Sequence, residues 1–235
     1  MTDDRKAGLA FIAGSIGGMV TMAIHPTSAG VLTPAQFERL AVVSGIAHSL
    51  AMVSFLVMFL GAIGLTRRLA AREGERQDRL AISGLVGYGF GAVALLLATA
   101  VSGFIVPDIM RHMIRDGAAN VSQWRMIIDA VFQFNQAFAR IYSVAASVAV
   151  MLWSVSALRN GGLGKVIAVY GCLIAPVLIV LIGVGHLRLD VHGMAAVVLA
   201  HAIWFVGVGV EMWKAVSHVD IASQISEARP GAPRQ

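Results

Sequence analysis

The sequence has little charge and almost no cysteine. Charged residues make up 13% of the 235 positions and apolar residues 57%, whereas an ordinary soluble domain is roughly 25% charged. Its one cysteine, Cys172, excludes an internal disulfide. A Walker phosphate loop, an HExxH zinc motif and a CxxCH haem-attachment motif are also missing. With a mean hydropathy of +0.77, these absences exclude an ordinary soluble domain, a disordered chain and a disulfide-stapled scaffold.

The chain contains six long apolar stretches, separated by polar segments or by segments that carry Pro and Gly. Each is long enough to cross a bilayer as a helix, and strand alternation is absent. The stretches are 8–24, 38–65, 82–106, 127–157, 165–185 and 191–213. We therefore predict an all-α polytopic membrane protein, with a six-transmembrane-helix bundle over 1–217 and a polar cytoplasmic tail over 218–235.

Several helix ends can be predicted from local signals. Thr33 is a good N-cap, Pro34 suits the first helical position, and Gln36 stands where a capping box needs it. The second helix should therefore begin before the membrane. Pro26 and Pro107 are predicted to end the first and third helices, because proline cannot donate a backbone hydrogen bond.

The distribution of Lys and Arg predicts the orientation. If the N-terminus is cytoplasmic, 12 of the 18 basic residues fall in inner segments and 5 in outer ones. This split favours cytoplasmic termini, and it accounts for the net charge of +5 without nucleic acid as a partner. The first charges cancel and no small-x-small cleavage site follows, so we expect no cleaved signal peptide. The predicted location is a bacterial inner or plasma membrane, with the lipid bilayer as partner.

Two pairs of glycines mark helix faces that can pack closely. Gly14 and Gly18 form a small-xxx-small pair in the first stretch, and Gly87 and Gly91 form another in the third. Such pairs let two helix backbones approach one another. We expect them to pack within the bundle, and a homo-oligomer formed through these faces is an open alternative.

The fourth stretch carries the most informative pattern. Polar residues recur there at spacings of four and three, which places them on one helix face. They are Asp129, Gln133, Gln136, Arg140, Ser143 and Ser147. An unpaired Arg is costly in lipid, so this face should look into the bundle. It predicts either an interhelical hydrogen-bond ladder or a polar cavity in which Arg140 pairs with an anion.

Two histidines lie at similar predicted depths in other helices. His48 and His201 are each about 12 Å below the outer start of their apolar stretch, at a rise of 1.5 Å per residue, and Gln136 lies at a similar depth. Three helices could thus converge on one polar site in the outer half of the membrane. The predicted ligand-binding residues are Ser44, His48, Gln133, Gln136, Arg140, His201 and Trp204.

The histidines also permit cofactor binding. His48 and His201 on facing helices could be the two axial ligands of haem b, or else a proton relay or two separate buried histidines. On the outer side, His25, His186, His192 and Asp190 could bind a divalent metal, with Asp108 or His112 as alternatives to Asp190. The spacing matches no strong metal motif, and interfacial histidines with Asp190 as a helix cap would explain the same residues.

Taken together, the sequence predicts an integral membrane protein with an intramembrane polar cavity. The cavity would bind, and could translocate, a small anionic or protonatable ligand, with charge pairing at Arg140 and histidine protonation as gate or relay. A haem b-binding redox protein and a metal-binding membrane enzyme that uses the outer histidines are the alternatives. Whether the protein is an enzyme is left open.

Overall fold

The computed structural model describes residues 2–26, 33–70, 79–116, 120–161 and 163–227, and the side chains of 121 and 215–227 are not described. These residues form helices and short connections. The helices are α1 (Asp3–Ile24), α2 (Pro34–Ala70), α3 (Arg79–Ala100), the π-helix η1 (Val101–Ile105), α4 (Val106–Asp116), α5 (Val121–Asn160), α6 (Lys165–Gly183) and α7 (Val191–Glu227).

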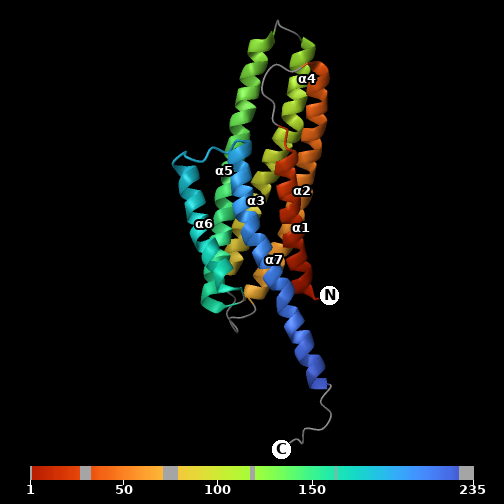
Figure 1. The fold of residues 1–235 in the computed structure, drawn as a ribbon. Coiled ribbons are helices and arrows are strands. Elements are labelled where there is room, and N and C mark those ends of the chain that lie inside the picture. Colours follow the sequence, from red (N-terminus) through yellow and green to blue (C-terminus); the bar gives the residue numbers. More distant parts are fainter. Residues whose placement is uncertain (1, 27–32, 71–78, 117–119, 162, 228–235) are drawn as a thin grey trace, which may run out of the picture.

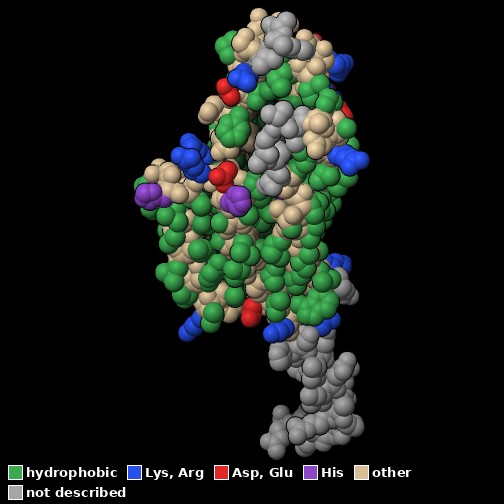
Figure 2. Space-filling model, turned by 45° about the horizontal axis from the view of Figure 1, so that its top comes forward, with side chains coloured by type: hydrophobic (Ala, Val, Ile, Leu, Met, Phe, Trp, Pro, Cys, Tyr) green, Lys and Arg blue, Asp and Glu red, His purple; other side chains and the backbone are tan. Residues whose placement is uncertain are grey.

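The prediction of an all-helical fold with six helices long and apolar enough to cross a membrane is confirmed for the described residues. Six helical segments are long and apolar enough to cross a membrane, with α3, η1 and α4 forming one of them. These six segments indicate a membrane-embedded protein. Figure 2 shows apolar side chains covering the middle of the molecule, while Lys and Arg gather toward its two ends. This distribution suits acyl chains around the middle and water or head groups at the ends.

Helix α2 begins where the capping signal predicted. The Thr33 amide donates to Gln36 Oε1 at 2.9 Å, and the Gln36 amide donates back to Thr33 Oγ1 at 3.3 Å. Two backbone donors of the first turn are thereby satisfied by side chains. Because the cap forms outside the apolar stretch, α2 is longer at this end than the predicted range 38–65.

The third helix does not end at Pro107, and that prediction was wrong. Pro107 is the second residue of α4, which follows α3 and η1 without a break. Within η1 the Val106 amide donates to the carbonyl of Val101, five residues earlier. Proline breaks a regular helix because it lacks an N–H and crowds the carbonyl four residues back. The wider π-turn just before Pro107 allows the helix to continue.

The helices form an elongated bundle in which α1 packs between α2 and α7, and α5 packs between α3 and α6. In Figure 1, α2, α4 and the first part of α5 extend past the outer ends of α6 and α7, while α7 continues beyond the bundle at the opposite end. The end with the α6–α7 connection is called the outer end below. Helix α7 runs to Glu227, into the predicted tail, and residues 228–235 lie outside the described part of the chain.

Aromatic side chains fill the inner half of the bundle. Trp153, Trp204, Tyr88 and Phe205 are fully buried, and ring contacts link all four. Two of the predicted glycine contacts are made within the chain. A Cβ on Gly14 would clash with α2, and a Cβ on Gly91 would lie 3.2 Å from Ala145 on α5. These two glycines therefore serve close helix packing inside the bundle.

Candidate functional site: an outer cavity lined by three histidines

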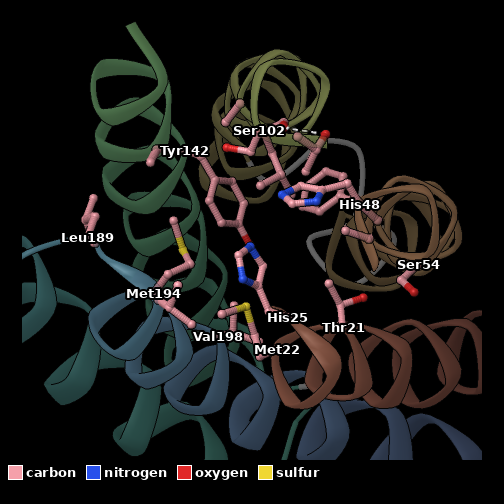
Figure 3. Close-up of a pocket in the computed structure, with 18 of the residues that line it drawn as sticks. Thr21, Met22, His25, His48, Ser54, Ser102, Tyr142, Leu189, Met194 and Val198 are labelled. Atoms are coloured by element: carbon pink, nitrogen blue, oxygen red, sulfur yellow. Dashed lines mark hydrogen bonds between the residues drawn. The ribbon is translucent and has the colours of Figure 1, made fainter. Parts of the chain in front are cut away.

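A cavity of about 370 Å³ lies between α1, α2, α3, α5 and α7 near the outer end (Figure 3). Along α7 its wall reaches from Val191 to Phe205, a distance of about 20 Å at 1.5 Å per residue. Most of the wall is Ala, Gly, Met, Phe and Val. The polar residues on it are Ser15, Thr21, His25, His48, Ser54, Thr99, Ser102, Asn135, Gln136, Tyr142, Asp190 and His201.

His48 is held by its own helix. Its Nδ1 lies 2.7 Å from the main-chain oxygen of Ser44, one turn earlier in α2. A carbonyl oxygen only accepts, so Nδ1 carries a proton, and in the neutral imidazole Nε2 then keeps its lone pair. The side chain of Ser44 donates to the Ser102 carbonyl of η1 at 3.4 Å. Ser44, a predicted ligand-binding residue, is therefore not on the cavity wall but holds His48 and η1 together.

The π-helix packs directly on His48. A Cβ built on Gly103 would lie 2.5 Å from the Cβ of His48, which is closer than two carbon atoms can approach. Glycine is therefore required for the contact between η1 and α2. Because π-turns frequently occur at functional sites, the position of η1 beside a cavity histidine is notable. Nothing in the hydropathy pattern indicated this turn.

His25 is the partner of His48 that the sequence did not reveal. It follows the last residue of α1, and its Nδ1 lies 3.2 Å from the Pro26 carbonyl. The centroids of the His25 and His48 rings are 5.0 Å apart, with the ring planes at 68°. Partial burial lowers the pKa of His25 below its usual value, which favours the neutral imidazole. His25 had been assigned to the outer histidines because it ends its helix.

His201 lies on the α7 side of the cavity, where its side chain is buried. Ser147 Oγ donates to the Ser143 carbonyl at 2.8 Å, so its lone pair accepts the 3.0 Å hydrogen bond from His201 Nε2. His201 Nδ1 then has a lone pair and no partner among the described residues. A haem iron bound by His48 and His201 would need His201 Nε2 or a different ring orientation, so this structure does not favour that alternative.

Three side chains on the cavity wall have a buried polar atom without a partner among the described residues. These atoms are Ser15 Oγ, Asn135 Oδ1 and His201 Nδ1. A buried polar atom without a hydrogen bond is unfavourable by about 1–3 kcal/mol. A molecule in the cavity can be the hydrogen-bond partner of each of these atoms. The neutral His201 Nδ1 and the Asn135 oxygen can only accept, so the partner must donate.

Arg140 does not line the cavity, and the prediction that it looks into the bundle is corrected. Its side chain is exposed, and so is that of Gln133. Gln136 does line the cavity, and its Nε2 donates to the Leu189 carbonyl at 3.1 Å. This hydrogen bond places Gln136 at the level of the α6–α7 connection. Arg140 is one turn inward, about 6 Å deeper, and its long side chain can reach the membrane surface.

Trp204 belongs to the core and not to the cavity. Its side chain is fully buried, and its Nε1 donates to Ser154 Oγ at 3.0 Å. It stacks on Trp153, with the ring centroids 6.0 Å apart. The prediction that Trp204 lines the same cavity as His201 is therefore corrected, although the two residues are one turn apart in α7.

The predicted outer metal set does not come together. His186 and His192 are exposed, and only His25 and Asp190 line the cavity. Asp190 Oδ1 accepts the Gly193 amide at 2.9 Å and so caps α7. Among the described residues no group of three or more His, Cys, Asp or Glu side chains could hold a metal ion. The sequence suggested that these side chains are neighbours in space, but the directions of the helices keep them apart.

Comparison with protein-family models, curated proteins and solved structures gives no match to this chain. The chemistry of the cavity is therefore argued from its own residues. It offers a mostly apolar space, neutral histidine nitrogens that accept hydrogen bonds, and one carboxylate at its outer end. No Lys or Arg is among the described residues that line it.

Proposed function

We propose that this membrane protein binds one small molecule in its outer cavity, and that the molecule has an apolar body and O–H or N–H donors. The single observation that carries the proposal is the gathering of Ser15 Oγ, Asn135 Oδ1 and His201 Nδ1 around one cavity, all buried and without a partner in the part of the chain that the structure describes. Native proteins satisfy nearly all buried polar atoms, and exceptions often mark a missing water or ligand.

The size and polarity of the cavity support the proposal. A volume of about 370 Å³ is within the range of roughly 300–1,000 Å³ for small-molecule sites. Such sites combine an apolar lining with a few polar groups that orient the ligand. The cavity is therefore suited to a molecule with an aromatic or aliphatic body.

The charge of the cavity supports a neutral or protonated ligand over an anion. The expectation of an anion rested on Arg140, which lies outside the cavity. The one charged side chain among the described lining residues is Asp190, and carboxylates repel anions. An alcohol, a phenol or a protonated amine would supply a donor to Asn135 Oδ1 and His201 Nδ1.

The proposal is for binding and not for translocation. The cavity reaches Phe205, and Phe205 is in contact with Tyr88 and Trp204 at ring-centroid distances of 5.6 and 5.2 Å. These fully buried rings occupy the inner half of the bundle. In this conformation a ligand can therefore bind from the outer end, while the buried rings fill the core on the inner side of the cavity.

Four compounds with one aromatic body test the proposal: benzylamine, benzyl alcohol, toluene and benzoate. Their binding to the full chain in lipid nanodiscs is measured by saturation-transfer NMR and by thermal shift. We expect benzylamine and benzyl alcohol to bind at least tenfold more tightly than benzoate. The affinity of toluene should lie between that of these two donors and that of benzoate. Benzoate binding as tightly as the amine, or no binding by any of the four, would overturn the proposal.

A matched pair of variants locates the binding site. Ala202 is buried on the cavity wall, whereas Ala196 is exposed on the same helix. Ala202→Phe places a ring in the cavity and should abolish binding, and Ala196→Phe should leave it unchanged. Size-exclusion chromatography checks that both variants are folded. Equal binding by the two variants would place the compounds elsewhere, for example in the lipid.

A further inference from the structure

The imidazoles of His25 and His48 face one another at the outer end of the cavity, and neither belongs to the set of unpartnered atoms used above. They come from different helices, α1 and α2, and their ring centroids are 5.0 Å apart. Figure 3 shows both rings projecting into the cavity. His48 is buried and His25 is half-buried, and their ring planes meet at 68°.

Each ring is oriented by a backbone carbonyl through Nδ1. The distances are 3.2 Å to the Pro26 oxygen for His25 and 2.7 Å to the Ser44 oxygen for His48. Both carbonyls accept, so both Nδ1 atoms carry a proton, and in the neutral imidazoles both Nε2 atoms keep a lone pair. Histidines that bind a metal show this arrangement, in which the second nitrogen donates to a carbonyl or carboxylate and fixes the tautomer.

The ring separation fits a shared metal ion. Two imidazoles bound through nitrogen at about 2.0 Å to one metal have ring centroids roughly 5–6 Å apart, and the observed separation is 5.0 Å. The thioether of Met22 is one turn before His25 on the same face of α1, and it lines the same cavity. In Figure 3 the Met22 side chain and the His25 ring leave the end of α1 together.

We propose that His25 and His48, with the Met22 thioether, bind a copper(I) ion at the outer end of the cavity. Structural zinc sites use four ligands, and no third His, Cys, Asp or Glu joins this pair among the described residues. Imidazole and thioether are ligands that copper(I) accepts, and it tolerates a low coordination number. A monovalent ion also loses less hydration energy than a divalent one in a mostly apolar cavity.

Metal titration of the purified full chain tests the site. Copper(I) is added without oxygen, under reducing conditions, in competition with the chromogenic chelator bicinchoninate. We expect one copper(I) ion per chain, and X-ray absorption with both nitrogen and sulfur neighbours. Met22→Leu should remove the sulfur neighbour and weaken binding severalfold. A stoichiometry near zero, or zinc(II) bound as tightly as copper(I), would overturn the proposal.

Matched histidine variants separate this site from binding at the surface. His25→Ala and His48→Ala should each weaken copper(I) binding at least tenfold, whereas His186→Ala and His192→Ala, at exposed histidines, should leave it unchanged. His48→Gln is a second variant in case the alanine disturbs the packing of η1, and size-exclusion chromatography reports on folding. Unchanged affinity in a folded His25→Ala, His48→Gln double variant would show that the pair is not the site.

Discussion

Gln136 donates a 3.1 Å hydrogen bond from Nε2 to the main-chain oxygen of Leu189. This contact fixes the height of α5 relative to the α6–α7 connection. The first part of α5 extends past the outer ends of α6 and α7 (Figure 1), and Arg140 lies one turn inward from Gln136.

Arg140 is predicted to be accessible to water. In a Cys172→Ser background, Arg140→Cys in lipid nanodiscs should react with a water-soluble maleimide within minutes. Ser147→Cys, about two turns further inward and fully buried, should be protected and serves as the control. Mass spectrometry measures both rates. Protection of Arg140→Cys equal to that of Ser147→Cys would show that the Arg140 position faces the bundle or the acyl chains.

Removing the hydroxyl of Ser147 should destabilise the bundle. The His201 Nε2–H would lose its acceptor at 3.0 Å, and the Nδ1 atom already has no described partner. We expect Ser147→Ala to lower the free energy of unfolding by about 1 kcal/mol, measured by SDS titration of the detergent-solubilised chain. Ser83→Ala, at an exposed serine of α3, should change it little. Equal effects would mean that this hydrogen bond does not stabilise the fold.

The contact between η1 and α2 should not tolerate a methyl group. A Cβ on Gly103 would lie 2.5 Å from His48 Cβ, whereas a Cβ on Gly87 has no atom closer than 4.0 Å. Gly103→Ala should therefore destabilise the chain by about 1–3 kcal/mol. Gly87→Ala should be neutral or slightly stabilising, because alanine favours the helix. Unfolding midpoints measure both, and a neutral Gly103→Ala would contradict the tight contact.

Ser15 offers a test that separates stability from binding. Its hydroxyl oxygen is buried without a partner among the described residues. Ser15→Ala should raise the free energy of unfolding of the ligand-free chain by about 1 kcal/mol and weaken benzyl alcohol binding severalfold. The same two measurements on Ser83→Ala serve as the reference. A loss of stability without any change in binding would instead assign the hydroxyl a structural role.

Part of the candidate site was predictable because it rests on depth along single helices. His48, Gln136 and His201 were expected at one level, and the structure places all three on the wall of one cavity. Ser44 was predicted to bind the ligand with His48, but it lies off the cavity wall and donates to the Ser102 carbonyl of η1. Helical spacing and a constant rise per residue suffice for such statements.

The sequence by itself determined the properties that depend on neighbours along the chain. The apolar stretches defined six helices, and Thr33 with Gln36 defined the start of α2, because hydropathy and capping act over a few residues. Only the tertiary structure determined how far each helix is shifted along its axis relative to its neighbours. The packing of the helices leaves Arg140 exposed, brings His25 next to His48 from two different helices, and includes the π-turn η1, through which the helix continues past Pro107. Contacts between helices set these features, and no local pattern encodes them.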